Sequence, residues 1–379
     1  MIEMARERIE SIYFLRLFAM MMVVLVHVTA AFHSVLPYGS DAFAKYHFIN
    51  RIIRVEAGIF IMITAMVFFY KYMEQKMDGA ELKAYYKKRA VYIVVPYLVW
   101  AVFYEALSIY TGAVSLNFSE IGLRILQGQS FYQLHFIFLI VQFYLFFPII
   151  LFVAQKVPFF KKYMWLFGIG IEIGYYFLNR EFQLIPFSSF LSALGPYLLG
   201  AWIGTYYKEQ KAKIFNKSTL FWTVSAIATG ITTVYLHYHL YTVNSLYLPG
   251  WTYLIINMIY IMTSSYLMFR LTEIICNKWP KLIPNVQNIA IYSFGFYLLH
   301  PFILKVVAQF IPLSGGYWFH AGIILRFLST LALCYLTIWL THRYFPMPGL
   351  LFGKLPKRAP RFLGLPRQKE EYSDKGASA

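Results

Sequence analysis

The sequence contains few charged residues and very few cysteines. Only 13% of its 379 residues are Asp, Glu, Lys or Arg, whereas soluble globular chains carry about 25%. This shortage of charge excludes an ordinary water-soluble enzyme. The chain is also 59% hydrophobic, and so much apolar surface to bury excludes a disordered chain. The two cysteines, Cys276 and Cys334, exclude a disulfide framework and a multi-thiolate metal site.

Long apolar segments make up most of the chain. A membrane-spanning helix needs roughly 20 mostly apolar residues, because the hydrocarbon core is about 30 Å thick. Such windows predict an all-α, polytopic membrane bundle of about ten helices, of which the fifth and sixth are the weakest because prolines and a glycine interrupt them. The windows are 12–32, 49–70, 91–110, 132–154, 162–178, 190–207, 218–236, 250–270, 288–311 and 321–341.

The basic residues predict the orientation of the chain. Lys and Arg concentrate on the cytoplasmic side of membrane helices. With the N-terminus inside, 26 of the 34 Lys and Arg fall in inner segments and only 5 in outer segments or outer helix ends. Both termini are therefore expected in the cytoplasm. We expect residues 1–342 to form one transmembrane domain and residues 343–379 to form a basic cytoplasmic tail that is partly disordered.

The first apolar window carries two ionisable residues on one face. Arg16 and His27 are eleven positions apart, which is about 20° past three full helical turns and about 16 Å along the axis. This pair, with Met20 and Val24 beside it, indicates a lined pathway across the membrane. The alternative is that Arg16 extends to the inner headgroups and His27 is a packed core histidine.

Further polar side chains are expected at membrane depth, mostly in its outer half. Charges there are costly and usually functional, so the set indicates a water-filled cavity that opens outward. The alternative is that these groups only pair with one another. The residues concerned are Arg54, Glu56, Glu105, His135, Glu172, Tyr297 and His300.

Two local patterns refine this expectation. Pro301 follows His300 and frees a backbone carbonyl, because proline has no N–H. His237 and His239 stand two residues apart in an expected outer loop, without an evident third ligand, so no metal site is expected there.

Lys87, Lys88 and Arg89 precede the third apolar window on its inner side. Such a cluster commonly anchors a helix end, and it is also suited to binding a phosphorylated ligand. The sequence has no Gly-rich phosphate loop, Walker pattern or Ser-centred nucleophile elbow, which disfavours nucleotide-driven transport and triad hydrolysis.

Four stretches of the sequence, taken in order, match motifs of one known family. They are Arg16 and His27 with ten residues between them, and residues 60–65, 86–97 and 293–301. The second is an apolar helix, the third a basic run ending in Ile-x-x-Pro-Tyr, and the fourth a Tyr-Leu-x-His-Pro signature. In these features the chain resembles the type-3 membrane acyltransferases, which modify bacterial surface carbohydrates and antibiotics, over residues 10 to about 340.

Two features depart from the family pattern. Members often carry a second Arg three positions into the basic motif, where this chain has Tyr92. Many members also carry an extracellular esterase-like domain, which this sequence does not show. The chain is also similar to membrane proteins of intercellular-adhesion polysaccharide systems, for which both export and acyl modification have been described.

The resemblance implies a reaction and its participants. The donor would be a cytoplasmic acyl-CoA, in the first place acetyl-CoA, used as a co-substrate with no permanently bound cofactor. The acceptor would be a hydroxyl of an extracytoplasmic glycan at a bacterial cell membrane. Besides these, the expected partners are membrane lipids. Nucleic acid is not expected, because most of the basic excess is accounted for by topology. The sequence leaves the oligomeric state open.

The resemblance also implies residue roles. Lys87, Lys88 and Arg89 would bind the phosphates of coenzyme A, with Arg16 nearby, and His27 would be the general base or a transient acyl carrier. The supporting or acceptor-binding residues would be Glu56, Glu105, His135, Tyr297 and His300. Two alternatives stay open: His300 instead of His27 as the chemical centre, and a polysaccharide exporter or flippase without acyl transfer.

Overall fold

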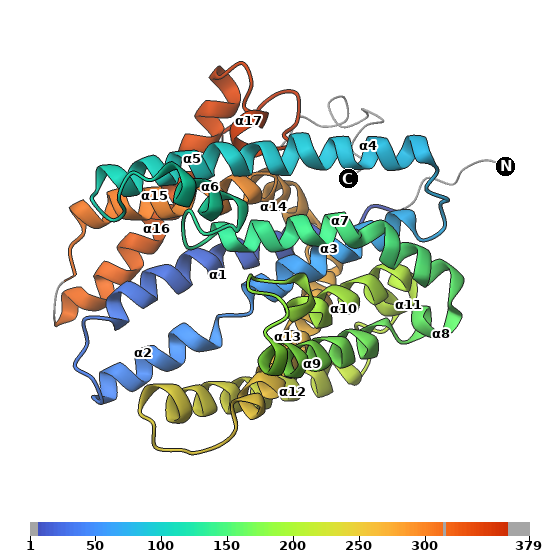
Figure 1. The fold of residues 1–379 in the computed structure, drawn as a ribbon, viewed down its shortest axis with the longest axis horizontal. Coiled ribbons are helices and arrows are strands. Elements are labelled where there is room, and N and C mark those ends of the chain that lie inside the picture. Colours follow the sequence, from blue (N-terminus) through green and yellow to red (C-terminus); the bar gives the residue numbers. More distant parts are fainter. Residues whose placement is uncertain (1–6, 314–315, 363–379) are drawn as a thin grey trace.

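The computed structural model describes residues 7–313 and 316–362, and in these ranges the chain forms helices without strands (Figure 1). The helices are α1 Ser11–His33, α2 Asp41–Ile52, α3 Glu56–Tyr72, α4 Gly79–Arg89, η1 Ala90–Val94, α5 Val95–Tyr110, α6 Phe118–Leu126, α7 Leu134–Lys156, α8 Pro158–Lys162, α9 Met164–Phe182, η2 Phe190–Ala193, α10 Leu194–Thr205, α11 Tyr207–Ala212, α12 Ser218–His237, η3 Tyr238–Thr242, α13 Gly250–Lys278, η4 Pro280–Leu282, α14 Ile283–Ala290, α15 Ser293–Phe310, α16 Tyr317–Tyr344 and α17 Gly349–Phe352.

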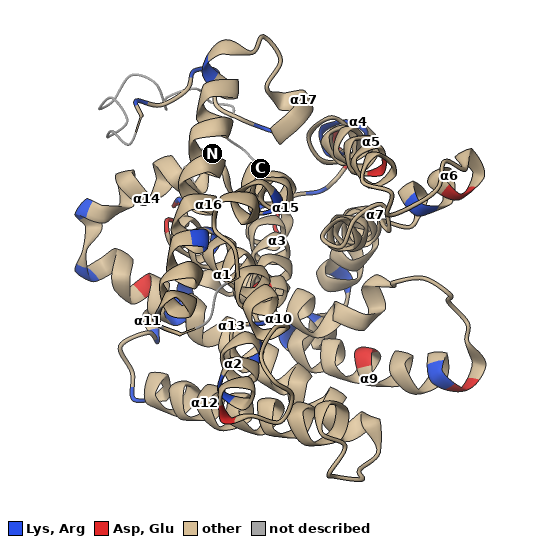
Figure 2. Cartoon of the chain, turned by 90° about the vertical axis from the view of Figure 1, so that its left-hand side faces the viewer, with Lys and Arg blue, Asp and Glu red and all other residues tan. Residues whose placement is uncertain are grey.

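The predicted polytopic helical bundle is confirmed. Among the described residues, eight helical segments are long and apolar enough to cross a membrane, and they coincide with eight of the ten expected windows. The fifth and sixth windows differ. They form α9, which is not one of the eight, and the short apolar segment Phe190–Thr205. Figure 2 shows the charged residues as short, separated patches on a ribbon that is otherwise neutral.

Helix α1 runs through the middle of the bundle (Figure 1). It packs against α2, α3, α13, α14, α15 and α16. Ser40 caps the start of α2 by accepting a hydrogen bond from the N–H of Phe43, as short polar side chains do at helix N-termini. From that start α2 runs back along α1, and Asn50 donates to the carbonyl of Val26 at 2.7 Å.

The closest helix pair in the bundle is α3 with α10, and glycine makes it possible. A Cβ on Gly200 would lie 2.1 Å from the Met62 carbonyl oxygen, and one on Gly204 would lie 2.2 Å from that of Met66. The two glycines are four residues apart, the spacing that lets membrane helices approach backbone to backbone. The sixth window is therefore short but buried in protein, because α10 packs directly on α3.

Helices α4, η1 and α5 form one continuous rod (Figure 1). Its middle turn is a π-helix, Ala90–Val94, a local irregularity that is frequent at functional sites. Pro96 has no N–H, so the Tyr92 carbonyl lacks its helical partner. Gly353 lies against this carbonyl: its φ is +72°, and a Cβ there would be 2.5 Å from the Tyr92 oxygen.

The segment after α16 returns to the helical bundle. Trp100 and Trp339 donate their indole N–H groups to the carbonyls of Leu351 and Pro360 at 2.9 and 2.8 Å. The part of the expected tail up to residue 362 is thus packed on α5 and α16. Residues 363–379, where partial disorder is expected, lie outside the described residues.

Candidate active site

The two histidines that the sequence offers as alternatives lie side by side. His27 of α1 and His300 of α15 have ring centroids 5.4 Å apart, with 26° between the ring planes. His300 is fully buried, whereas His27 is partly exposed. Because the two rings are adjacent, both His27 and His300 can contribute to the same chemical centre.

The hydrogen bonds of His300 fix which ring nitrogen carries its proton. Nδ1 lies 3.0 Å from the carbonyl oxygen of Phe296 and 2.9 Å from that of Tyr297. Carbonyl oxygens only accept, so Nδ1 carries the hydrogen and donates. The Tyr297 carbonyl is available because Pro301, four residues on, has no N–H. Nε2 therefore has a lone pair, and in the described part of the chain it is buried with no hydrogen-bond partner.

Tyr297 and Glu56 belong to the same region. The Tyr297 hydroxyl donates to the carbonyl of Gln133, and its ring centroid is 6.0 Å from that of His300. Glu56, the first residue of α3, interacts electrostatically with Tyr297. Its Oε2 is buried and has no hydrogen-bond partner among the described residues. The structure thus brings together four of the sequence-predicted site residues, namely His27, Glu56, Tyr297 and His300.

Tyr132 completes the surroundings of His27. Its ring centroid lies 4.6 Å from that of His27, at an interplanar angle of 48°. His135 is exposed, and its Nδ1 donates to the Tyr132 carbonyl at 2.7 Å. His135 therefore supports the segment that carries Tyr132 and contacts the histidine pair only through it.

A narrow apolar cavity leads from His300 along α1. It is nowhere wide enough for a water molecule. Met20 and Val24, which the sequence places on the face of Arg16 and His27, are part of its wall. The lining residues are Met20, Val23, Val24, Phe60, Ser293, Phe296, Tyr297 and His300.

Arg16 of α1 and Arg89 of α4 both lie toward the end of the bundle where α1 begins. Arg16, four residues before Met20, interacts with the Tyr144 hydroxyl, and Arg89 interacts with the same hydroxyl. The Arg89 guanidinium lies 4.5 Å from the ring centroid of Phe68 and 5.1 Å from that of Tyr85. Its Nε and Nη2 are buried, and neither has a hydrogen-bond partner among the described residues. An anionic ligand would reach these donors only after the aromatic rings packed on the guanidinium move.

Lys87 and Lys88 are exposed beside Arg89, and Lys354 joins them from the returning C-terminal segment. Burial, and after it the positive charges of Lys88 and Arg89, lower the pKa of Lys354. Gly353 brings Lys354 to this position by packing on Tyr92. Like charges so close together favour an anion bound between them.

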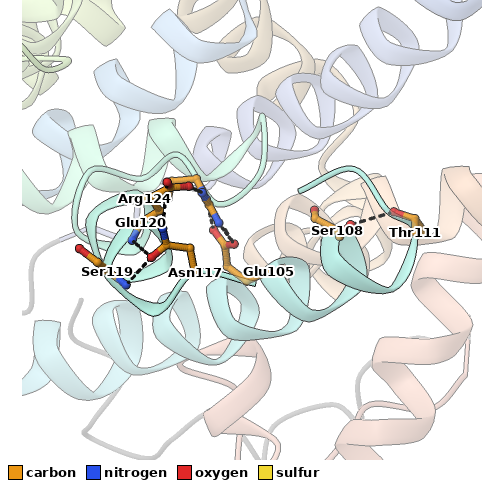
Figure 3. A network of polar contacts seen from close by, with 7 residues as sticks. All are labelled: Glu105, Ser108, Thr111, Asn117, Ser119, Glu120 and Arg124. Atoms are coloured by element: carbon orange, nitrogen blue, oxygen red, sulfur yellow. Dashed lines mark hydrogen bonds and ion pairs between the residues drawn. The ribbon is translucent and has the colours of Figure 1, made fainter. Parts of the chain in front are cut away.

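Glu105 lies in a different setting from the one expected. Arg124 donates through Nε and Nη2 to both carboxylate oxygens of Glu105, at 2.8–3.3 Å, and through Nη1 to Glu120 at 3.4 Å (Figure 3). The hydrogen bond to Glu105 is the main cause that raises the pKa of Arg124. Glu105 is therefore engaged in joining α6 to α5.

Sequence reasoning missed several residues that the fold adds to the site. Tyr132 and Tyr144 are two of 32 tyrosines, so composition does not distinguish them. Lys354 lies more than 260 positions from Lys88 in the chain, and the local signal for its placement is Gly353, whose positive φ only the structure reveals. Each of these contacts joins segments far apart in the sequence.

These features define the class of the protein: a polytopic membrane protein with paired histidines beside a narrow apolar cavity and a basic cluster at one end. A family model described as an acyltransferase domain matches residues 9–342. The chain belongs to the acyltransferase 3 family and is a membrane acyltransferase. Comparisons with curated proteins and with solved structures give no match.

Proposed function

We propose that the protein transfers an acyl group, in the first place acetyl, from cytoplasmic acyl-CoA to a hydroxyl of an extracytoplasmic glycan at a bacterial cell membrane. The end where α1 begins would face the cytoplasm. The observation that carries the proposal is the arrangement along α1: unpaired basic donors near Arg16, then the apolar cavity, then the histidine pair.

The basic cluster would bind the donor. The phosphates of coenzyme A match the unpaired Nε and Nη2 of Arg89 together with Lys87, Lys88 and Arg16. The arm that ends in the thioester would enter along this cavity only if the lining side chains moved aside, because the cavity is too narrow even for water. An apolar cavity without water also protects a thioester from hydrolysis before the acceptor arrives.

The histidine pair would carry out the transfer. The acceptor hydroxyl oxygen bonds to the thioester carbonyl carbon while His27 removes the hydroxyl proton, and the carbon–sulfur bond then breaks. The departing thiolate takes the proton from His27, so the protein ends unchanged. His300 Nε2 can accept a hydrogen bond from His27 or from the acceptor, since Nδ1 is occupied by the backbone.

Purified protein in lipid nanodiscs, supplied with radiolabelled acetyl-CoA and candidate glycans, provides the test. His27→Ala is expected to lower transfer by about 10²–10⁴-fold, the usual contribution of a general base, with unchanged insertion and thermal unfolding. The matched control is His320→Ala, which removes an exposed histidine whose Nδ1 is hydrogen-bonded to Tyr46.

Three outcomes would contradict parts of the proposal. Near-wild-type acyl transfer by the His27→Ala variant would show that His27 is not the general base. Labelled acetyl on the protein in the absence of acceptor would replace direct transfer by an acyl-enzyme step. Glycan translocation without acyl-CoA dependence would favour the exporter or flippase that the sequence leaves open.

A further inference from the structure

A second cavity, separate from the apolar one, lies where α2 meets α3 and faces α12 and α13. Its accessible space is about 210 Å³, which is room for one small charged group and less than the roughly 300–1,000 Å³ of sites for whole drug-sized ligands. Its lining is polar and basic, in contrast to the first cavity. The lining residues are Arg51, Arg54, Thr233, His237, Tyr253 and Asn257.

Two arginines supply the charge of this pocket. Arg51 and Arg54 interact electrostatically with each other and with His237. In the described part of the chain, neither guanidinium forms an ion pair with a carboxylate. Glu56, two residues after Arg54, interacts electrostatically with both Arg54 and Tyr297 but forms no such direct pair. Arg54 is exposed and Arg51 only partly buried, so both guanidinium groups are accessible to an anion that enters the pocket.

Polar groups on the opposite wall are also unsatisfied. Thr233 is only 4% exposed, and its Oγ1 has no hydrogen-bond partner among the described residues. The same holds for His237 Nδ1. A buried hydroxyl without a partner loses free energy unless a ligand or water completes its hydrogen bonds. Two guanidinium groups, a hydroxyl and the Asn257 amide together match an oxyanion, because all of them can donate hydrogen bonds.

The pocket is connected to the histidine pair through one residue. Arg54 donates to Asn50 Oδ1 at 3.1–3.2 Å, and Asn50 donates to the Val26 carbonyl at 2.7 Å. Val26 immediately precedes His27. The pocket is therefore at the same level along α1 as His27, on the α2 side of that helix.

We propose that this pocket binds an anionic group, a carboxylate or phosphate, on the acceptor glycan and so positions its neighbouring hydroxyl toward His27. This inference rests on the proposed function for the identity of the ligand as an acceptor. The anion-binding property itself depends only on the pocket. The acceptor class is then an acidic or phosphorylated saccharide and not a neutral one.

A charge-selective labelling experiment tests the pocket without requiring acyl transfer. Asn257→Cys in the full chain, in phosphatidylcholine nanodiscs, is treated with an anionic sulfonatoethyl or a cationic trimethylammonioethyl methanethiosulfonate. Both native cysteines are buried, so the new thiol is the reactive one. The anionic reagent is expected to react about tenfold faster than the cationic one, relative to a free thiol. Arg51→Gln with Arg54→Gln should abolish this preference.

Matched variants keep the outcome interpretable. Arg180→Gln removes an exposed arginine of α9 and should leave the preference unchanged. If the double variant fails to fold, Arg51→Gln alone should lower the preference by at least threefold. Equal rates for the two reagents in the Asn257→Cys protein that keeps both arginines would overturn the anion site.

Competitors then distinguish the source of the anion. Digalacturonate is expected to slow labelling of the Asn257→Cys variant, and neutral lactose is not. If phosphatidylglycerol in the nanodisc blocks labelling and digalacturonate does not, a lipid headgroup fills the pocket and the acceptor assignment is overturned. If charge selectivity and digalacturonate protection persist in a protein that transfers no acyl group, the proposed function fails while the anion site stands.

Discussion

Two regions of this protein bury charge in opposite ways. In α13, Arg270 is 1% exposed and donates to Thr219, Ser218, Tyr266 and the Lys213 carbonyl. In α3, α4 and α15, several buried polar groups lack a hydrogen-bond partner within the described part of the chain. Among the described residues, Glu56 Oε2, His300 Nε2 and two Arg89 nitrogens have no hydrogen-bond partner.

The difference separates stability from function. A buried charge with all its hydrogen bonds joins helices, and removing it exposes several unpaired groups at once. A buried polar group without partners destabilises the fold slightly and is retained for a ligand. The two kinds of residue should therefore respond oppositely when stability and activity are measured on the same variant.

The largest expected effect is a loss of stability when Arg270 is replaced. Arg270→Ala removes the hydrogen bonds to Ser218, Thr219, Tyr266 and the Lys213 carbonyl at once, although the Thr219 and Tyr266 hydroxyls keep their bonds to the Ile214 carbonyl and to Gln210. We expect a loss of about 3–5 kcal/mol in the free energy of unfolding, because several hydrogen bonds to a charged group, each worth about 1.5–3 kcal/mol, are lost together; it is measured as a fall in Tm by fluorescence-monitored unfolding in detergent. An unchanged Tm would show that the network does not stabilise the fold.

Pro301→Ala tests the opposite behaviour. It restores an N–H that competes for the Tyr297 carbonyl, so the His300 ring loses one of its two acceptors. We expect kcat to fall by about 10–100-fold, because the His300 ring beside His27 is no longer held in its orientation. The Tm should stay the same or rise. A fall in Tm with kcat unchanged would show that Pro301 stabilises the fold and does not orient His300.

Arg89→Gln should affect donor binding. The substitution removes a charge over the Phe68 and Tyr85 rings, and Nε and Nη2 have no hydrogen-bond partner among the described residues to lose. We expect KM for acetyl-CoA to rise about tenfold, the equivalent of one charge-assisted contact, with Tm changed little. Lys83→Gln, an exposed lysine of the same helix, is the control and should leave KM unaltered.

The smallest effect is expected for Glu105→Gln, which lies between the two classes. The Glu105–Arg124 pair is buried on one side only, with side-chain exposures of 4% and 21%. Its loss should lower the free energy of unfolding by about 1 kcal/mol, with a smaller difference from wild type at about 1 M salt. If Glu105→Gln abolished acyl transfer without lowering stability, Glu105 would have a role in the reaction.

The sequence predicts much of the architecture and part of the site. Continuous apolar runs locate the helices, and helical periodicity places Arg16 and His27 on one helix with Met20 and Val24, residues of the cavity wall. The His-Pro pair also predicts a freed carbonyl. In contrast, the sequence does not predict the pairing of Glu105 with Arg124, because that contact depends on how α6 folds back on α5.

Other contacts depend on the packing of distant helices and could not be predicted. Arg270 lies at the end of the eighth apolar window, where its sequence position gives no sign of the buried network that joins it to residues about 50 positions away. Asn50 shows no motif, yet it links the basic pocket to α1. Local patterns describe one helix at a time, and these functions arise between helices.

The dry cavity beside His300 has a consequence for the cell as well as for the reaction. A protein that passes a group from one membrane face to the other risks becoming a conduit for protons, which move along chains of hydrogen-bonded water. A constriction formed by Met20, Val24 and Phe60 that excludes water interrupts any such chain. We therefore expect reconstituted vesicles to retain their pH gradient with this protein at rest, so the membrane stays electrically sealed between turnovers.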